Sequence, residues 1–308
     1  DVTYEITSLR TDVSCNGRHA EVAFTKNWED DLARRDFTMN AMSLDFDGNL
    51  IDPFNGYNDL KNRSVRFVGD PTERIKEDYL RILRWYRFRG RFDDTAPDLN
   101  SFEAVNDEAG GLFNISRERV WSEFSKIISG NNGPNVVEMM HRDRVVEFCN
   151  LYQTIIDVHH CADVHRITKN PVTLMVAMYG YQAISALKSW KASSDEIKLA
   201  AWLHEATGMD KTPRWFIAVQ NVKREWVLEL TAIKLMDEFE RSIIAEWVSP
   251  EFPVNGFDLI KLGIKPGRQY SQIIDDLKNK WADSTYTMNK EDLLATVDKS
   301  LFSMIFNQ

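Results

Sequence analysis

The 308-residue sequence has few cysteines, no long apolar run and less positive than negative charge. Its three cysteines, Cys15, Cys149 and Cys161, are too few and too scattered for a disulfide framework, and they fit a reducing compartment. No stretch approaches the roughly 18 consecutive apolar residues of a membrane span, and the start is not a charged-then-apolar signal segment. The composition therefore excludes a disulfide scaffold and favours a cytoplasmic protein with no membrane partner.

The net charge of −9 argues against a surface that binds nucleic acid everywhere, because phosphate binding needs positive potential. The distribution of charge is more informative. Residues 61–91 hold ten Lys and Arg against four Asp and Glu, whereas residues 93–108 hold six acidic residues and no basic one. A basic element within an acidic protein predicts one localised site for a polyanion.

The order of the patterns predicts an α+β fold, with a small sheet first and helices afterwards. Alternating apolar residues predict strands at 2–9, 20–25 and 39–46, and residues 47–49 predict a hairpin turn into a strand at 50–52. Helical periodicity begins at Pro71 and continues through Tyr86. Further helices are predicted at 101–109, 117–129, 134–148, 171–190, 194–206, 211–222, 225–247, 256–261, 267–281 and 290–303.

The densest cluster of charged residues is EDDLARRDFTMNAM at 29–42. An arginine fork donates two aligned hydrogen bonds, which suits triphosphate oxygens, and an adjacent aspartate can accept from ribose hydroxyls. Arg34, Arg35 and Asp36 are therefore candidates for binding a ribonucleotide. A solvated charge cluster at the end of a strand is the alternative for these residues.

A second cluster, EDYLRILRWYRF at 77–88, places Asp78, Arg81, Arg84 and Arg87 three residues apart. On one helix they form a slowly drifting stripe, for which a salt-bridged surface is the ordinary explanation. Asp78 with Arg81 also makes an acceptor and a donor that match the Watson–Crick edges of cytosine and adenine. Guanine and uracil would leave both groups mispaired, and buried polar pairing can reject such analogues by roughly 10⁴-fold or more.

The sequence from residue 29 to residue 88 resembles the signature region of class II tRNA nucleotidyltransferases (CCA-adding enzymes) and bacterial poly(A) polymerases. The shared blocks are RRDFT-N-A, IDPF-G--DL and VGDP--R--ED-LR-LR--RF, and ISRERV follows at 115–120. They stand in the order and at the spacing of that family over about 120 residues. The resemblance implies a nucleotidyltransferase-type head sheet followed by an elongated helical neck, body and tail.

The resemblance implies a nucleotide-binding site made of the Arg-Arg-Asp motif, the Glu-Asp-x-x-Arg motif that reads the base, and neighbouring side chains. Its expected members are Arg34, Arg35, Asp36, Asn40, Asp78, Arg81, Arg84 and Arg87. Residues 11–18 are expected to form the flexible loop that helps to select CTP or ATP. In the tail, Lys261, Lys265 and Arg268 beside Gly263 and Gly267 are candidates for RNA contacts, with a plain helical hairpin as the alternative.

In this family, Asp-x-Asp carboxylates hold Mg²⁺ after a Gly-Gly-x-x-Arg-Asp stretch, and neither motif precedes Glu5. Asp45 and Asp47 have the right spacing but the wrong place, so they are interpreted as turn residues. We therefore expect no catalytic or metal ligand here, with Glu5 as a candidate supporting carboxylate. The chain alone is expected to be inactive, with an N-terminal catalytic segment supplied in cis or in trans.

Two other motifs have simple structural explanations. His159, His160, Cys161 and His165 do not match a zinc pattern, and a polar loop between helices is the preferred interpretation. Leu203-His204-Glu205 is taken as ordinary helix, and most of the nine tryptophans are expected in helical cores.

The predicted division is a partial head at 1–62, a neck at 63–130, a body at 131–212 and a tRNA-binding tail at 213–308. The predicted function is addition of CCA to tRNA 3′ ends from CTP and ATP. A poly(A) polymerase and an inactive RNA-binding relative are the alternatives.

Overall fold

The computed structural model describes residues 4, 6–15, 20–92, 96–152, 156–264, 266–267 and 269–297. The chain divides into two compact units, Asp1–His204 and Glu205–Gln308. The fold is α+β as predicted, with two short two-stranded sheets in the first unit and helices in most of the remainder. The four-part division of the chain stays a prediction. Among the described residues, no helix combines the length and apolar character needed to cross a membrane.

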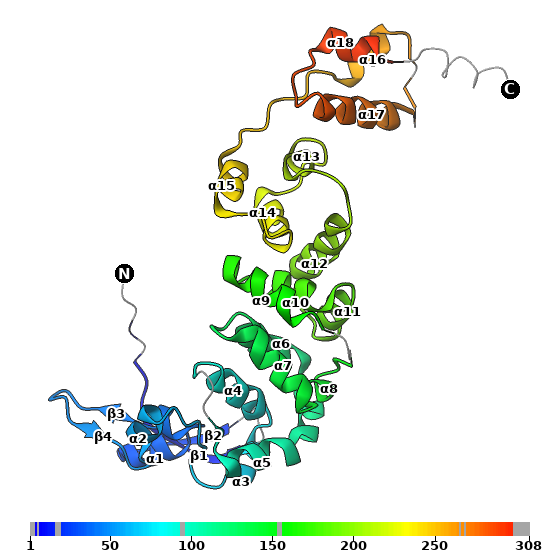
Figure 1. Cartoon of the computed structure of the whole chain (residues 1–308). Coiled ribbons are helices and arrows are strands. Elements are labelled where there is room, and N and C mark those ends of the chain that lie inside the picture. The colour runs from blue at the N-terminus through cyan, green and yellow to red at the C-terminus, as the bar shows by residue number, and fades with distance from the viewer. Residues whose placement is uncertain are drawn as a thin grey trace. The chain divides into compact units, whose positions relative to one another are not determined.

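The front of the first unit mixes strands with short helices (Figure 1). Its elements are β1 (Arg10–Cys15), β2 (Ala20–Phe24), α1 (Trp28–Ala33), the 3₁₀ turn η1 (Thr38–Asn40), β3 (Ser43–Leu44), β4 (Leu50–Ile51) and α2 (Gly56–Lys61). β1 pairs antiparallel with β2, and β3 pairs antiparallel with β4 around Gly48, whose φ is +85°. The hairpin turn at 47–49 is thereby confirmed.

Three predictions for this region were wrong. Residues 6–9 form no strand, and β1 begins at Arg10 instead, so that residues 11–15 of the expected loop are also strand. The strand expected at 39–46 is a 3₁₀ turn followed by a two-residue strand, because the Thr38 amide bonds to the Arg66 carbonyl and the segment then turns on itself. Residues 16–18 of the expected loop, and Glu5, lie outside the described residues.

An aromatic core joins this front to the first long helix. The Phe37 ring packs 5.0 Å from that of Phe67 and 5.2 Å from that of Phe88, and Phe37 is fully buried. Trp85 is also fully buried and donates its indole N–H to the Val65 carbonyl at 3.1 Å. Burying such large side chains is worth roughly 1.5–3 kcal/mol each, so these contacts fix residues 36–38 against the helix.

The next elements of the first unit are α3 (Pro71–Glu77), α4 (Leu80–Arg89), α5 (Leu99–Asp107), the 3₁₀ helix η2 (Ala109–Asn114) and α6 (Arg117–Ile128). α4 packs against α6, and Asp70 caps α3 by accepting from the Glu73 amide at 2.9 Å. The continuous helix predicted from Pro71 through Tyr86 was wrong. It breaks at Asp78, whose φ of −157° and ψ of 100° are extended.

The later helices of the first unit are α7 (Gly133–Arg142), α8 (Val145–Phe148), α9 (Val158–Ile167), α10 (Pro171–Tyr179), α11 (Gln182–Ser189) and α12 (Ser194–Thr207), and the unit boundary falls within α12. The helices predicted at 134–148 and 171–190 are each split in two, at Arg144 (φ +61°) and Gly180 (φ +55°). The polar loop expected around His159 was also wrong, because these residues begin α9, capped by Asp157.

The second unit is helical where it is described. Its helices are α13 (Pro213–Ala218), α14 (Arg224–Ile233), α15 (Glu238–Glu246), α16 (Gly256–Lys261), α17 (Gln269–Asp283) and α18 (Lys290–Ala295). The helix predicted at 225–247 is split after Ile233, with Leu235 at a φ of +54°. Trp281 is 2% exposed and packs in a core with Leu277 and Leu293. Tryptophan in helical cores is confirmed here, as it is for Trp85 and Trp190.

Candidate functional site

The Arg-Arg-Asp motif directly follows α1 and is held by backbone contacts. The guanidinium of Arg74, on α3, donates to the carbonyls of Arg34 and Arg35, each at 2.7 Å. Asp31, 4% exposed, forms ion pairs with Arg34 at 2.9 Å and Arg35 at 3.1 Å. Burial by itself would raise the pKa of Asp31, but hydrogen bonds from the Arg10 amide and both arginines outweigh it and lower the pKa.

Asp36 is the most tightly held carboxylate of the site. The Val68 backbone amide donates to the Asp36 carbonyl at 3.1 Å. Asp36 is 8% exposed, and its carboxylate accepts from the side-chain Nδ2 of Asn40 at 3.0 Å. Arg84 on α4 donates to Asp36 Oδ2 through Nε at 2.7 Å and also through Nη2. Burial alone would raise the pKa of Asp36, but the charge of Arg84 and these hydrogen bonds lower it. Asp36 is therefore ionised at neutral pH.

Asp78 lies in the break between α3 and α4, rather than on one helix with Arg81. Its Oδ2 accepts from Arg119 on α6 at 2.7 Å, and its Oδ1 accepts from the Leu80 amide at 3.2 Å. Arg81 donates to Glu77 Oε2 at 2.6 Å and to the Arg74 carbonyl at 2.7 Å. The two groups expected to read a base are thus each held by a different partner.

These residues surround one cavity of about 580 Å³, a size typical of small-ligand sites. Six of the eight predicted nucleotide-binding residues line it: Arg35, Asp36, Asn40, Asp78, Arg81 and Arg84. Leu80, Phe88 and Arg119 also line it and were not predicted as site residues. Arg119 belongs to the block at 115–120, and the basic residues of that block were the sequence signal that could have predicted it as a site residue.

The other two predicted residues are placed elsewhere. Arg34 is paired with Asp31 and donates to the Arg10 carbonyl at 3.0 Å, and it does not line this cavity. Arg87 pairs with the buried Glu123 at 3.0 Å and lines a separate cavity. In the second unit, Lys261 is exposed at the end of α16, while Lys265 and Arg268 lie outside the described residues.

Within the described residues, no cluster of three or more His, Cys, Asp or Glu side chains could hold a metal ion. Asp45 accepts from the amides of Asp47 at 2.9 Å and Asn49 at 2.8 Å, so its oxygens stabilise the turn. Cys161 is buried, with its Sγ 3.5 Å from the Leu174 carbonyl. The described residues therefore do not fit a magnesium site.

The chain is similar to proteins of known family. Residues 1–66 match the family model described as the poly A polymerase head domain, and residues 97–149 match one described as a probable RNA and SrmB-binding site of polymerase A. A solved structure of a Bacillus stearothermophilus CCA-adding enzyme in complex with CTP superposes with a TM-score of 0.74 at 23% identity. It covers 94% of this chain and 76% of that one, and it shows a shared fold.

Among protein sequences, the mitochondrial CCA tRNA nucleotidyltransferase 1 of Danio rerio is 38% identical over 96% of this chain and 73% of its own length. The human protein of the same name is 36% identical over the same shares. The CCA-adding enzyme of Pediococcus pentosaceus is 29% identical over 89% of this chain. On this similarity, the chain belongs to the family of CCA tRNA nucleotidyltransferases, the CCA-adding enzymes.

Proposed function

We propose that this chain selects CTP and ATP and binds tRNA for template-independent addition of CCA to the tRNA 3′ end. The observation that carries the proposal is the cavity of about 580 Å³, in which two carboxylates and four guanidiniums gather from three chain segments. Such a mixture suits a ligand that has both phosphates and a base edge. The relatives' names, and a Thermotoga maritima CCA-adding enzyme solved with tRNA at a TM-score of 0.63, support this choice of substrates.

In this proposal, Asp78 and Arg81 form hydrogen bonds with the base. Asp78 then exchanges its bond to Arg119 for one from the exocyclic amine of cytosine or adenine. Guanine and uracil present a carbonyl at that position, so they would break the Asp78–Arg119 pair without replacing its hydrogen bond. An unpaired polar group costs about 1–3 kcal/mol, more when charged, which favours C and A.

Arg35 and Arg84 are assigned to the triphosphate and Asp36 to the ribose hydroxyls, with Asn40 holding Asp36 in place. Arg35 is suited to this role because its side chain is 47% exposed while its backbone carbonyl is held by Arg74. The assignments of Arg34 and Arg87 from the motif stay predictions, since neither lines this cavity.

The catalytic carboxylates and their Mg²⁺ are proposed to come from an N-terminal catalytic segment, in cis or in trans. The compartment is also a proposal: the composition favours the cytoplasm, whereas the vertebrate relatives are named mitochondrial.

The test joins the chain with its catalytic segment and supplies a tRNA transcript lacking its last three nucleotides, with CTP, ATP and Mg²⁺. Addition that stops after C, C and A supports the proposal, whereas long A tails would assign a poly(A) polymerase. Calorimetry on the chain alone is the second measurement. If CTP and ATP bind no more tightly than GTP and UTP, the base-selecting role is wrong.

A further inference from the structure

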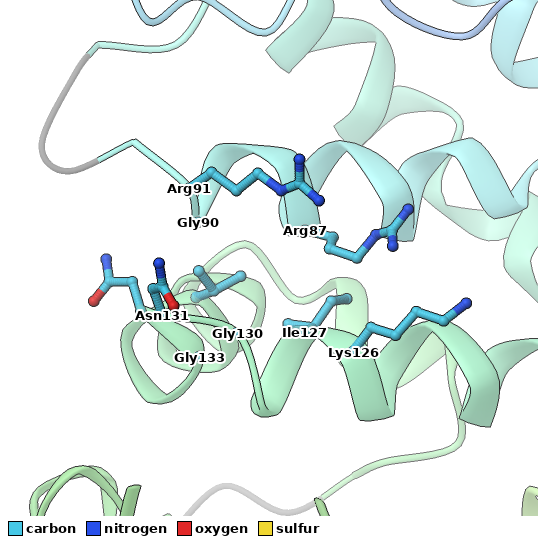
Figure 2. A pocket seen from close by; sticks show the side chains of 10 residues that line it. Arg87, Gly90, Arg91, Lys126, Ile127, Gly130, Asn131 and Gly133 are labelled. Atoms are coloured by element: carbon cyan, nitrogen blue, oxygen red, sulfur yellow. The ribbon is translucent and has the colours of Figure 1, made fainter. Parts of the chain in front are cut away.

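A second cavity, of about 340 Å³, lies between α4, α6 and the loop that leads into α7. Figure 2 shows Arg87 on α4 and Arg91 just beyond its end, across the cavity from the segment that carries Lys126 and from Asn131 in the following loop. This cavity shares no lining residue with the cavity of about 580 Å³. Three of its lining residues, Arg87, Arg91 and Lys126, are basic and none is acidic.

Three cations and one carboxylate set the charge of this cavity. Glu123, 4% exposed, pairs with Arg87 at 3.0 Å and with Lys126 at 3.0 Å. The Arg87 Nε–H does not point at the Glu123 oxygen, so that contact is an ion pair without an aligned hydrogen bond. Arg91 has no carboxylate partner among the described residues and lies 4.6 Å above the Phe88 ring. The cavity therefore carries an excess of positive charge.

The neighbouring cations affect the pKa of Arg87. Burial, followed by the charges of Arg84 and Arg91, lowers the pKa of Arg87 against the opposing effect of Glu123. An anion between Arg87 and Arg91 would relieve that repulsion.

Glycines let the segments that line the cavity pack closely against one another. A Cβ on Gly133 would lie 2.0 Å from the Ile128 carbonyl oxygen, and one on Gly90 would lie 2.5 Å from a Val136 methyl group. The start of α7 contributes little to anion binding, because the Gly133 N–H already donates to the Gly130 carbonyl and Pro134 has no N–H. Binding must therefore depend on the side chains of Arg91, Lys126 and Arg87.

We propose that this cavity binds a backbone phosphate of the RNA substrate through Arg91, Lys126 and Arg87. Phosphate contacts by Arg and Lys position a nucleic acid without reading its sequence, which fits a site that has no base-reading carboxylate. Lys126 and the loop after it also lie within residues 97–149, the segment that matches the probable RNA-binding family model. The choice of RNA as the source of the phosphate rests on the proposed function.

The experiment measures binding of the chain to a tRNA transcript lacking its last three nucleotides, by fluorescence anisotropy across a range of salt concentrations. Arg91→Gln and Lys126→Gln should each weaken binding about 3- to 10-fold and reduce the slope of log affinity against log salt by about 1. Arg142→Gln and Lys198→Gln are the matched controls, because they remove the same charges from exposed side chains, 73% and 67% accessible. These controls should leave the slope unchanged.

Two further probes separate the possible failures. Tight binding of inorganic phosphate that Arg91→Gln abolishes, with tRNA binding unaffected, would assign a free phosphate ion and overturn the proposal. Unchanged tRNA affinity and slope in both cavity variants would also overturn it. The affinities of the wild-type chain for CTP and GTP are measured in parallel. Equal affinities would contradict the proposed function. Weaker binding of an RNA hairpin of equal length by Arg91→Gln and Lys126→Gln would still support a backbone-phosphate site.

Discussion

Replacing Arg84 by glutamine should destabilise the first unit and should do so in a pH-dependent way. Arg84 is the only guanidinium bonded to the side chain of Asp36 among the described residues, and Asp36 is 8% exposed. Removing one partner of a buried pair costs roughly 3–5 kcal/mol, whereas an exposed pair contributes up to about 1 kcal/mol. Because the Arg84 side chain is 30% exposed, the pair lies between these limits. We expect Arg84→Gln to lower the free energy of unfolding by about 2 kcal/mol at pH 7.

The pH dependence follows from the lowered pKa of Asp36. A carboxyl group whose pKa is lower in the folded than in the unfolded chain stabilises the fold above its unfolded pKa, about 3.9. That stabilisation is lost as the pH falls through the folded pKa. The difference in free energy of unfolding between wild type and Arg84→Gln should therefore stay constant from pH 8 to pH 5 and shrink below about pH 4.

The assay is urea unfolding of wild type, Arg84→Gln, Asp36→Asn and the double variant at pH 7 and pH 3.5. The double-mutant cycle should return a coupling energy above about 1 kcal/mol at pH 7 and a smaller one at pH 3.5. Arg142→Gln, an exposed arginine in a 3.5 Å pair, is the control and should change stability by less than about 0.5 kcal/mol. A loss for Arg84→Gln no larger than that of the control would refute the reasoning.

Three other outcomes can be measured directly. Arg81→Ala should abolish discrimination against GTP and UTP in calorimetric binding, and unchanged selectivity would exclude a base-reading role. Gly56→Ala should lower the urea midpoint, by more than 1 kcal/mol in stability, because the new methyl group would lie 2.1 Å from a backbone carbonyl oxygen; an unchanged midpoint would contradict this. Cys149 and Cys161 are buried with thiol pKa values raised to about 12, so at pH 8 a thiol reagent should modify at most Cys15 before unfolding and all three afterwards.

The fold class and most of the site could be predicted because both depend on local patterns. Helical periodicity after Pro71 and the turn at Gly48 are encoded within a few residues, so a single sequence predicts both. The spacing of Asp78 and Arg81 was visible as well, but the break between them was not. That break depends on Arg119, 41 residues further on, which holds Asp78 in its extended conformation.

The errors at the front of the chain have the same cause. Residues 39–46 alternate in the manner of a strand, but the Thr38 hydroxyl bonds to the buried Asp59 at 2.5 Å and draws the segment into a 3₁₀ turn. A tertiary partner that is distant in sequence decides this case, and a single sequence does not identify it.

The loop predicted around His159 is wrong for a local reason. The Asp157 side chain accepts from the His160 amide at 2.9 Å and starts α9, whose buried side is Cys161, Val164 and His165.

The candidate site is positioned mainly by main-chain contacts. Arg74 holds the carbonyls of Arg34 and Arg35, and the Val68 amide holds that of Asp36, so the backbone of the motif is tied to two later segments. The motif's side chains have both local and distant partners: Asp31 pairs with Arg34 and Arg35, and Arg84 on α4 bonds to Asp36. Mutations that remove the Arg74 guanidinium should consequently impair binding of every nucleotide alike, whereas changes at the base-reading positions should alter the choice among nucleotides. The two classes of effect separate the residues that build the cavity from those that select its ligand.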